Sequence, residues 1–534
     1  MQGFRKKGLK IIVVSLILIS FVAGFLTYPL IEKLAIRSVP DEIGTIEIRG
    51  YVLYSQDLEY LLKLIDYAKT HSSIKAIVLD IDSGGGVSYA FEQLYYSIRL
   101  VSKTKPVVAS ISGLAASGGY YLAASAEYIY ASPTSFVGNI GVVAFMPERV
   151  YPVPSIMETG PYKLSGFNLT SFPLQVNDAI SNFVNNVKEG RGGRLNASPS
   201  TLEKAEIYLG SEAKSIGLID EVGSIEQAID KAASLAGITN YKVSILNEII
   251  PNTFPFSTLA ISPFSLELND SFLSGIYPPP AIYCIYSPFL ANYQSQPLKQ
   301  ITYPNGLQET NTGEDVIIAY AYRNAFSRDE IESLLTEIIL NGHTFSFLTD
   351  KSQLQSKLMN AKAFVVIAPT ESFSDRENQI VKGFVERGGK LILISSILRA
   401  SQKEINSLSY GFGIVFSSSY LYNLRSYYGI YRYIFVSNFT INGNNNFNIF
   451  KNVSKIVMMT ASPIYSSDIN EAALTDNGTY SFVSDKTMQY TPIVVSYNGR
   501  IVAIGSFEMF TQPFITLYGN EKFEENIVNF MFSG

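Results

Sequence analysis

Histidine and cysteine are scarce in this sequence and tryptophan is absent: 534 residues include two histidines, one cysteine and no tryptophan. The single cysteine, Cys284, permits no internal disulfide and no cysteine-based metal cluster. The two histidines, His71 and His343, nearly exclude a histidine-rich metal site and argue against a Ser-His-Asp triad. A serine nucleophile in this chain is therefore expected to depend on a different base.

Charged residues are also few. They make up 16% of the sequence, with a net charge of −5, whereas 47% of the residues are hydrophobic. This composition excludes a disordered acidic or basic protein. Because no basic patch or stripe is evident, nucleic acid is not an expected partner. The length predicts roughly two to four folded domains.

The N-terminus has a basic flank followed by a long apolar run. Four basic residues lie before position 11, and an uncharged stretch of 21 residues follows at 11–31. About 20 apolar residues are enough to cross a bilayer as a helix, and the basic flank is expected to stay cytoplasmic. We predict a cytoplasmic tail at 1–10, a single-pass signal anchor at 11–31 and an extracytoplasmic location for the remainder of the chain.

A cleaved signal peptide is the alternative to an anchor, because Ala23 and Gly24 are small residues of the kind found at cleavage sites. Glycosylation motifs of the Asn-X-Ser/Thr type agree with export, although such motifs also arise by chance. They begin at Asn168, Asn196, Asn269, Asn438, Asn452 and Asn477.

The clearest chemical signal is a short apolar strand that ends in small residues. The strand begins at Val107 and is followed by Ser117 and a Gly-Gly pair, and the residues from Tyr121 to Ala126 suit a helix. Free backbone N–H groups at such a junction favour negative charge. An acyl-transfer enzyme places its nucleophile and part of its oxyanion hole in this setting, although such turns are also common as plain connections.

A second glycine-rich turn, Ser83-Gly84-Gly85-Gly86, follows another predicted strand at 74–82. Three glycines in a row let a backbone approach a ligand closely. The two turns, with Ala115-Ala116-Ser117-Gly118-Gly119-Tyr120-Tyr121 as the specific segment, resemble the signal peptide peptidase A family. These are S49-type serine peptidases with a ClpP/crotonase-like α/β fold. The segments Gly138-Asn139-Ile140-Gly141-Val142 and 208–223 are also similar to that family.

The resemblance implies a Ser-Lys dyad with Ser117 as nucleophile. The lysine of the family follows a short turn, and Met157 to Lys163 matches that context 46 residues after Ser117. A lysine accepts a proton only as a neutral amine, which burial among apolar groups favours. Tyr162, Leu164 and Phe167 are expected to supply such surroundings. Lys188 is the weaker alternative base, because the residues around it are charged and are expected to be exposed to solvent. His71 is considered as the base only if the lysine assignment fails.

The resemblance also implies an oxyanion hole made of backbone amides, those of Gly118 and of Gly85, with Gly86 as the neighbouring alternative. Two departures from the family pattern stand out. Gly84 replaces a proline in the first turn, which makes that turn less rigid, and Leu164 replaces a polar or acidic residue after the lysine. Neither departure removes a catalytic group.

The alternation of strands and helices predicts an α/β domain at 42–240. The resemblance to the S49-type peptidases covers this whole region and implies a peptidase domain. A connector rich in proline and aromatic residues follows at 241–313. Residues 314–534 restart the α/β pattern and resemble glutamine-amidotransferase-like, flavodoxin-type domains. That class needs a cysteine nucleophile, and Cys284 lies before the domain begins. This domain is therefore expected to be non-catalytic and to serve binding or assembly.

Together these features predict a membrane-anchored serine endopeptidase that needs no cofactor or metal. The resemblance implies hydrophobic or unfolded peptides as substrates, such as remnant signal peptides, and a homo-oligomer in which Lys163 acts on the Ser117 of its own or a neighbouring chain. One alternative is an inactive-peptidase scaffold or binding protein that acts through its C-terminal domain. A crotonase-like acyl-CoA enzyme is the other, and export away from cytosolic CoA argues against it.

Overall fold

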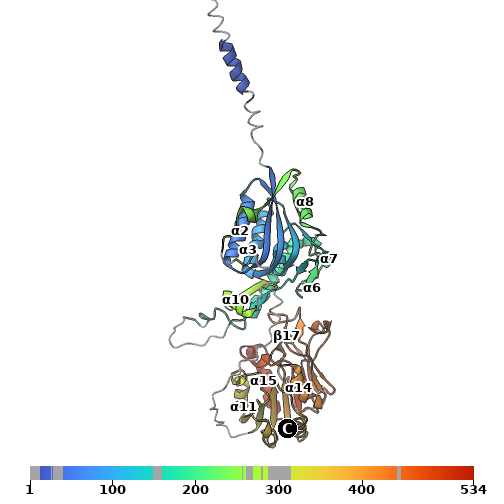
Figure 1. Cartoon of the computed structure of the whole chain (residues 1–534). Helices are drawn as coiled ribbons and strands as arrows, with labels where there is room; N and C mark the ends of the chain where they lie inside the picture. The colour runs from blue at the N-terminus through green and yellow to red at the C-terminus, as the bar shows by residue number, and fades with distance from the viewer. Residues whose placement is uncertain are drawn as a thin grey trace, which may run out of the picture.

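The chain forms two α/β units, shown end to end in Figure 1. The computed structural model describes residues 13–25, 27, 40–147, 159–160, 162–254, 257–259, 269–277, 281–286, 314–441 and 447–533. The first unit is built on a ten-stranded sheet and the second on an eight-stranded sheet. The mixed α/β class predicted from the sequence is therefore confirmed.

The first unit has long parallel strands at its centre. β1, β2, β3 and β4 pair side by side in parallel, and the connecting helices α2 and α3 pack against one face of the sheet. The strands are β1 (Asp41–Val52), β2 (Ile74–Val87), β3 (Val107–Ala116), β4 (Tyr128–Ala131), β5 (Phe136–Gly138), β6 (Val143–Phe145), β7 (Ile207–Leu209), β8 (Glu221–Val222), β9 (Tyr241–Ile245) and β10 (Ala281–Ile285).

Helices cover both faces of this sheet. The larger core lies beneath α2, α3, α4 and α5, and α8 buries Ala228, Ala232 and Ala233 on the opposite face. The helices are α2 (Ser55–Thr70), α3 (Ser88–Val101), α4 (Gly118–Ala123), α5 (Phe172–Arg191), η1 (Gly192–Arg194), α6 (Pro199–Leu202), α7 (Gly210–Ser215), α8 (Ile225–Ala236), α9 (Leu246–Ile249) and α10 (Asp270–Ile276).

Two local features of this unit differ from the sequence-based expectation. β2 does not end at residue 82 but runs through the glycine turn to Val87, because the turn still pairs with β1 across a register shift at Gly50/Tyr51. The segment 138–142, which is similar to a strand of the S49-type family, is not one strand: Gly138 ends β5, and residues 139–142 separate β5 from β6.

The sheet of the first unit continues beyond residue 240. β9 pairs in parallel with β1, and β10 pairs with both β2 and β6 in antiparallel fashion. Polar contacts also fix residues 257–259 to the first unit. Thr258 donates from its backbone N–H and its hydroxyl to the buried carboxylate of Asp57. Part of the proline-rich segment thus belongs structurally to the first unit.

The second unit places five parallel strands beside three antiparallel ones, in the order β12-β11-β13-β14-β25-β24-β21-β18. Its strands are β11 (Val316–Ala319), β12 (Phe345–Leu348), β13 (Ala363–Ile367), β14 (Lys390–Ile394), β15 (Ile414–Phe416), β16 (Leu421–Asn423), β17 (Tyr433–Val436), β18 (Asn438–Ile441), β19 (Ile456–Met459), β20 (Ile464–Ser466), β21 (Glu471–Leu474), β22 (Thr479–Ser481), β23 (Lys486–Thr487), β24 (Ile493–Ser496) and β25 (Ile501–Ile504). The predicted likeness to amidotransferases stays a prediction.

Helix starts in the second unit follow the capping signals in the sequence. Ser327 with Glu330 and Ser374 with Glu377 form capping boxes, a pattern that is recognisable in the sequence. The helices are η3 (Arg328–Ile331), α11 (Glu332–Leu340), η4 (Lys351–Gln353), α12 (Leu354–Lys357), α13 (Asp375–Glu386), α14 (Gln402–Ser409), η5 (Tyr410–Phe412), η6 (Glu508–Phe510), η7 (Phe514–Thr516) and α15 (Asn520–Met531).

The loop before β17 joins the second unit to the start of α5. Tyr428 donates its hydroxyl to the carbonyl of Thr170 at 2.7 Å, and Tyr427 donates to the Asn177 side chain at 2.7 Å. A second contact is the ion pair between Lys204 Nζ and Asp485 Oδ2 at 2.9 Å. The two units thus contact each other through side chains of both.

Near the N-terminus, residues 13–25 are helical with exposed side chains. This helix lies within the predicted anchor at 11–31, of which residues 11–12, 26 and 28–31 lie outside the described part. Among the residues that the structure describes, no helix is both long and apolar enough to cross a membrane.

In the second unit, ionisation of the buried carboxyl groups of Glu471 and Glu524 opposes folding. Glu471 is 1% exposed and Glu524 is 2% exposed. Burial raises the pKa of each to about 7. Because the folded pKa exceeds the usual carboxyl value, the folded state binds more protons than the unfolded state between about pH 4.5 and 7. Stability should therefore fall as the pH rises through this window.

We expect Glu471→Gln to remove part of this pH dependence, because the neutral amide needs no proton to remain buried. Wild-type protein should be more stable at pH 5 than at pH 7.5 by up to about 3 kcal/mol per buried carboxyl. Urea denaturation at both pH values measures the difference, with exposed Glu332→Gln as the control. If Glu471→Gln and wild-type protein showed the same pH dependence of stability, ionisation of Glu471 would not be its cause.

Candidate active site

Ser117 lies on a sharp turn between β3 and α4. Its backbone angles, φ 55° and ψ −118°, are uncommon for a residue with a side chain. The turn is held on both sides, since Ser117 N–H donates to the Gly138 carbonyl and the Ser117 carbonyl accepts from Tyr121 N–H, each at 2.9 Å. Backbone strain of this kind costs about 1–3 kcal/mol and concentrates at functional sites.

The Ser117 side chain is fully buried. Its Oγ donates a hydrogen bond to the carbonyl of Gly141 at 3.2 Å. A carbonyl cannot take the hydroxyl proton, so this contact fixes the side chain without activating it. The structure thus shows the candidate nucleophile in a resting arrangement.

The glycine turn of β2 lies directly against the amide that follows Ser117. A Cβ atom built on Gly85 would lie 2.7 Å from the backbone nitrogen of Gly118. Gly85 adopts φ 96°, a left-handed conformation that glycine permits, and its N–H donates to Ser83 Oγ at 3.2 Å. Gly85 and Gly118, predicted to supply the oxyanion amides, therefore lie side by side.

Gly86 differs from its neighbour. A Cβ atom there would lie 2.1 Å from the carbonyl oxygen of Val52, which places Gly86 tightly against β1. The same absence of space explains the Gly-Gly pair after the serine. A Cβ atom on Gly118 would meet the Phe91 ring at 2.5 Å, and one on Gly119 would meet the Ser83 carbonyl oxygen at 2.3 Å.

Lys163 lies on an exposed turn at 162–165, where its N–H donates to the Gly160 carbonyl at 3.0 Å. No hydrogen bond or ion pair joins its side chain to Ser117 within the described ranges, from which 148–158 and 161 are excluded. The expectation of apolar surroundings is wrong for this conformation, because Tyr162 is 50% exposed and Leu164 is 44% exposed. The dyad stays a prediction.

The two weaker candidates for the base are also placed. His71 follows α2 and precedes β2, whereas Ser117 follows the parallel strand β3. His71 therefore lies at the end of the sheet opposite the nucleophile, across roughly 40 Å of strand length. Lys188 is half-buried on α5, and its neighbours Gly190 and Arg191 are buried rather than open.

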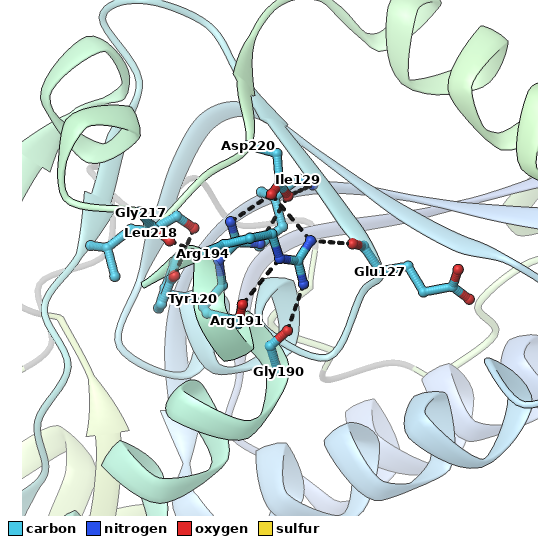
Figure 2. Close-up of polar contacts among 9 residues, drawn as sticks. All are labelled: Tyr120, Glu127, Ile129, Gly190, Arg191, Arg194, Gly217, Leu218 and Asp220. Atoms are coloured by element: carbon cyan, nitrogen blue, oxygen red, sulfur yellow. Dashed lines mark hydrogen bonds and ion pairs between the residues drawn. The ribbon is translucent and has the colours of Figure 1, made fainter. Parts of the chain in front are cut away.

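A buried ion pair behind α4 was not anticipated from the sequence. The Arg191 guanidinium, 0% exposed, donates to both carboxylate oxygens of Asp220 at 2.8 Å. Arg194 adds a contact to Asp220 at 3.1 Å, and Figure 2 shows both guanidinium groups converging on this carboxylate. Asp220 also accepts from the N–H of Ile129 in β4 at 2.8 Å.

This network joins the end of α5 to the residues that hold α4. Arg191 Nε donates to the Gly217 carbonyl at 2.8 Å, and the buried Tyr120 hydroxyl donates to the neighbouring Leu218 carbonyl at 2.7 Å (Figure 2). Tyr120 stands three residues after Ser117. The ion pair therefore supports the helix that follows the nucleophile.

Among the described residues, no group of three or more His, Cys, Asp or Glu side chains is arranged to hold a metal ion.

Comparison with known proteins identifies the first unit. Residues 99–149 and 161–239 match peptidase family S49. A protein of Methanocaldococcus jannaschii named “Putative protease” is 32% identical over 230 residues, which cover 40% of this chain and 73% of that protein. The chain belongs to peptidase family S49. It is thus a serine peptidase, and the matched residues include both Ser117 and Lys163.

Other S49 relatives differ in length. Protease 4 of Haemophilus influenzae is 27% identical over 225 residues, and the match covers 38% of this chain but only 36% of that protein. Among solved structures, a membrane-bound stomatin-specific protease in complex with a substrate peptide has 20% sequence identity and a TM-score of 0.26. That match covers 41% of this chain and 88% of the other.

The buried ion pair of the S49 domain should be essential for its stability. Asp220→Asn leaves the Arg191 charge buried without its partner, so we expect a loss of about 3–5 kcal/mol. Calorimetric unfolding of the full chain measures the shift of the transition of this domain.

The matched control is Glu189→Gln, which breaks an exposed contact between Glu189 and Arg99 at 3.4 Å. Exposed pairs contribute about 1 kcal/mol or less. Equal transition temperatures for Asp220→Asn and Glu189→Gln would show that the Arg191 charge is solvated in solution.

Proposed function

We propose that this chain is a membrane-anchored serine endopeptidase in which Ser117 attacks the peptide bond and Lys163 is the general base. The strained turn at Ser117, with the Gly118 amide beside Gly85, is the observation that carries the proposal. Its substrates are hydrophobic or unfolded peptides, such as remnant signal peptides, at the outer face of the membrane.

The reaction follows from these groups. Neutral Lys163 takes the hydroxyl proton while Ser117 Oγ forms a bond to the peptide carbonyl carbon, and the Gly85 and Gly118 amides stabilise the oxyanion. The peptide C–N bond then breaks, and the lysine proton passes to the departing amine. A water molecule, deprotonated by the same lysine, releases the acyl group from the serine.

The position of Lys163 on an exposed turn leaves two routes for this proton transfer. The turn moves toward the Ser117 of its own chain, or it reaches the Ser117 of a neighbouring chain in a homo-oligomer. On both routes, Ser117 and Lys163 come together only when a substrate binds or when chains associate. The hydrogen bond from Ser117 to the Gly141 carbonyl, which does not activate the serine, agrees with this.

Labelling by a serine-directed phosphonate tests the nucleophile and separates a peptidase from an inactive scaffold. We expect wild-type protein to be labelled and to cleave apolar peptides, with the products mapped by mass spectrometry. Ser117→Ala should abolish labelling and lower turnover by about 10³-fold or more. Lys163→Arg should be inactive as well, because guanidinium stays protonated.

Two further measurements sharpen this test. Lys188→Ala should leave turnover nearly unchanged, because this lysine is not part of the proposed dyad. Co-assembly of Ser117→Ala with Lys163→Arg restores activity only if the lysine acts between chains. Near-normal turnover by purified Lys163→Arg protein would rule out Lys163 as the base.

The membrane anchor is proposed from the basic flank and the uncharged run at 11–31. We expect protease added to intact spheroplasts to digest the S49 domain, because the positive flank stays in the cytoplasm. An epitope placed at the N-terminus is the control and should survive until lysis. Full protection of the S49 domain before lysis would contradict this orientation.

A further inference from the structure

β10 is a five-residue strand from the proline-rich segment that lies between two strands of the candidate active site. On one side it pairs antiparallel with β2: Ile285 lies opposite Gly85, Cys284 opposite Gly86 and Tyr283 opposite Val87. On the other side it pairs antiparallel with β6: Ala281 lies opposite Phe145, Ile282 opposite Ala144 and Tyr283 opposite Val143. β10 therefore fills the gap between β2 and β6.

Both neighbours of β10 belong to the site of Ser117. β2 carries the glycine turn, and β6 begins two residues after Gly141, whose carbonyl accepts the Ser117 hydroxyl. The position of a Cβ atom on Gly85 lies 2.0 Å from the Cys284 carbonyl oxygen and 2.7 Å from the Gly118 nitrogen. A carbonyl of β10 thus lies beside the amide predicted to stabilise the oxyanion.

Side chains hold β10 firmly in this gap. Tyr283 and Ile285 are buried in a small cluster with Tyr51 and Leu53. The Cys284 side chain is also buried, with its Sγ 3.3 Å from Ser88 Oγ. Just after the strand, Tyr286 N–H donates to the Gly84 carbonyl at 2.7 Å. A second strand cannot pair with the same edges while β10 occupies them.

Extended peptides commonly bind proteins by adding a strand to an exposed sheet edge, with main-chain hydrogen bonds supplying affinity. We propose that β10 is an internal substrate mimic that keeps the peptide groove between β2 and β6 in a self-inhibited state. The proposal rests on the peptidase function proposed above. All five residues of β10 are uncharged, so a displacing peptide of similar apolar character pairs with β2 and β6 in its place.

A reversible covalent lock tests this idea in the full chain. Ile282 and Ala144 face each other across the β10–β6 pair, and both are half-buried. We expect Ile282→Cys combined with Ala144→Cys to lose hydrolysis of an apolar decapeptide when oxidised, because the disulfide prevents β10 from leaving. Reduction should restore turnover to that of the reduced starting protein.

Two variants serve as controls. Asn438→Cys with Leu474→Cys places an equivalent cross-strand pair in the second unit, where Asn438 faces Leu474, and its oxidation should leave turnover unchanged. Ile285→Ala weakens the packing of β10 without altering the serine or the lysine. It should raise kcat/KM for the decapeptide about tenfold, because truncating a buried isoleucine shifts β10 toward the released state.

The outcomes separate the two proposals. Equal turnover by the oxidised and reduced lock, with Ser117 still labelled by phosphonate, would overturn self-inhibition and leave the peptidase function intact. Unchanged kcat/KM in Ile285→Ala would also overturn it. Absence of both labelling and hydrolysis in wild type, reduced lock and Ile285→Ala would overturn the peptidase function, and self-inhibition with it.

Discussion

Two backbone segments approach each other in the first unit at a distance that leaves no room for a Cβ atom. Gly85 at the end of β2 faces the Gly118 nitrogen, and Gly119 faces the Ser83 carbonyl. This approach places the candidate oxyanion amides together and requires the sharp turn at Ser117. The Arg191–Asp220 ion pair helps to hold this strained turn in place. It connects α5 to the loop whose Leu218 carbonyl accepts the Tyr120 hydroxyl.

The sequence predicts this part of the fold well because each element is specified locally. Its buried strands are short apolar runs, and its helices show apolar residues at helical spacing. In the second unit, the capping boxes at Ser327 and Ser374 likewise mark where helices begin. Glycine runs at 84–86 and 118–119 mark positions where only glycine fits, and for this reason the site can be located from the order of residues alone.

Features that depend on contacts between residues far apart in the sequence are not predicted from it. β10 is short and surrounded by prolines, so it resembles a linker, and its pairing with Gly85 and Gly86 spans almost two hundred residues of sequence. Arg191 stands among glycines and charged residues and reads as exposed, yet it is buried because Asp220, 29 residues later, neutralises it. Neither local propensity nor periodicity contains such information.

Ser117, Gly85 and Gly118 thus lie close together in this conformation, although the Gly85 N–H donates to Ser83 Oγ, and no hydrogen bond joins the described Lys163 side chain to Ser117. Lys163 lies only seven residues before Thr170, whose carbonyl accepts the hydroxyl of Tyr428 from the second unit. Any movement of Lys163 toward a serine must be absorbed within this short segment or must disturb the contact between the two units. The second unit therefore restrains the element that carries the candidate base, even though it supplies no candidate catalytic group.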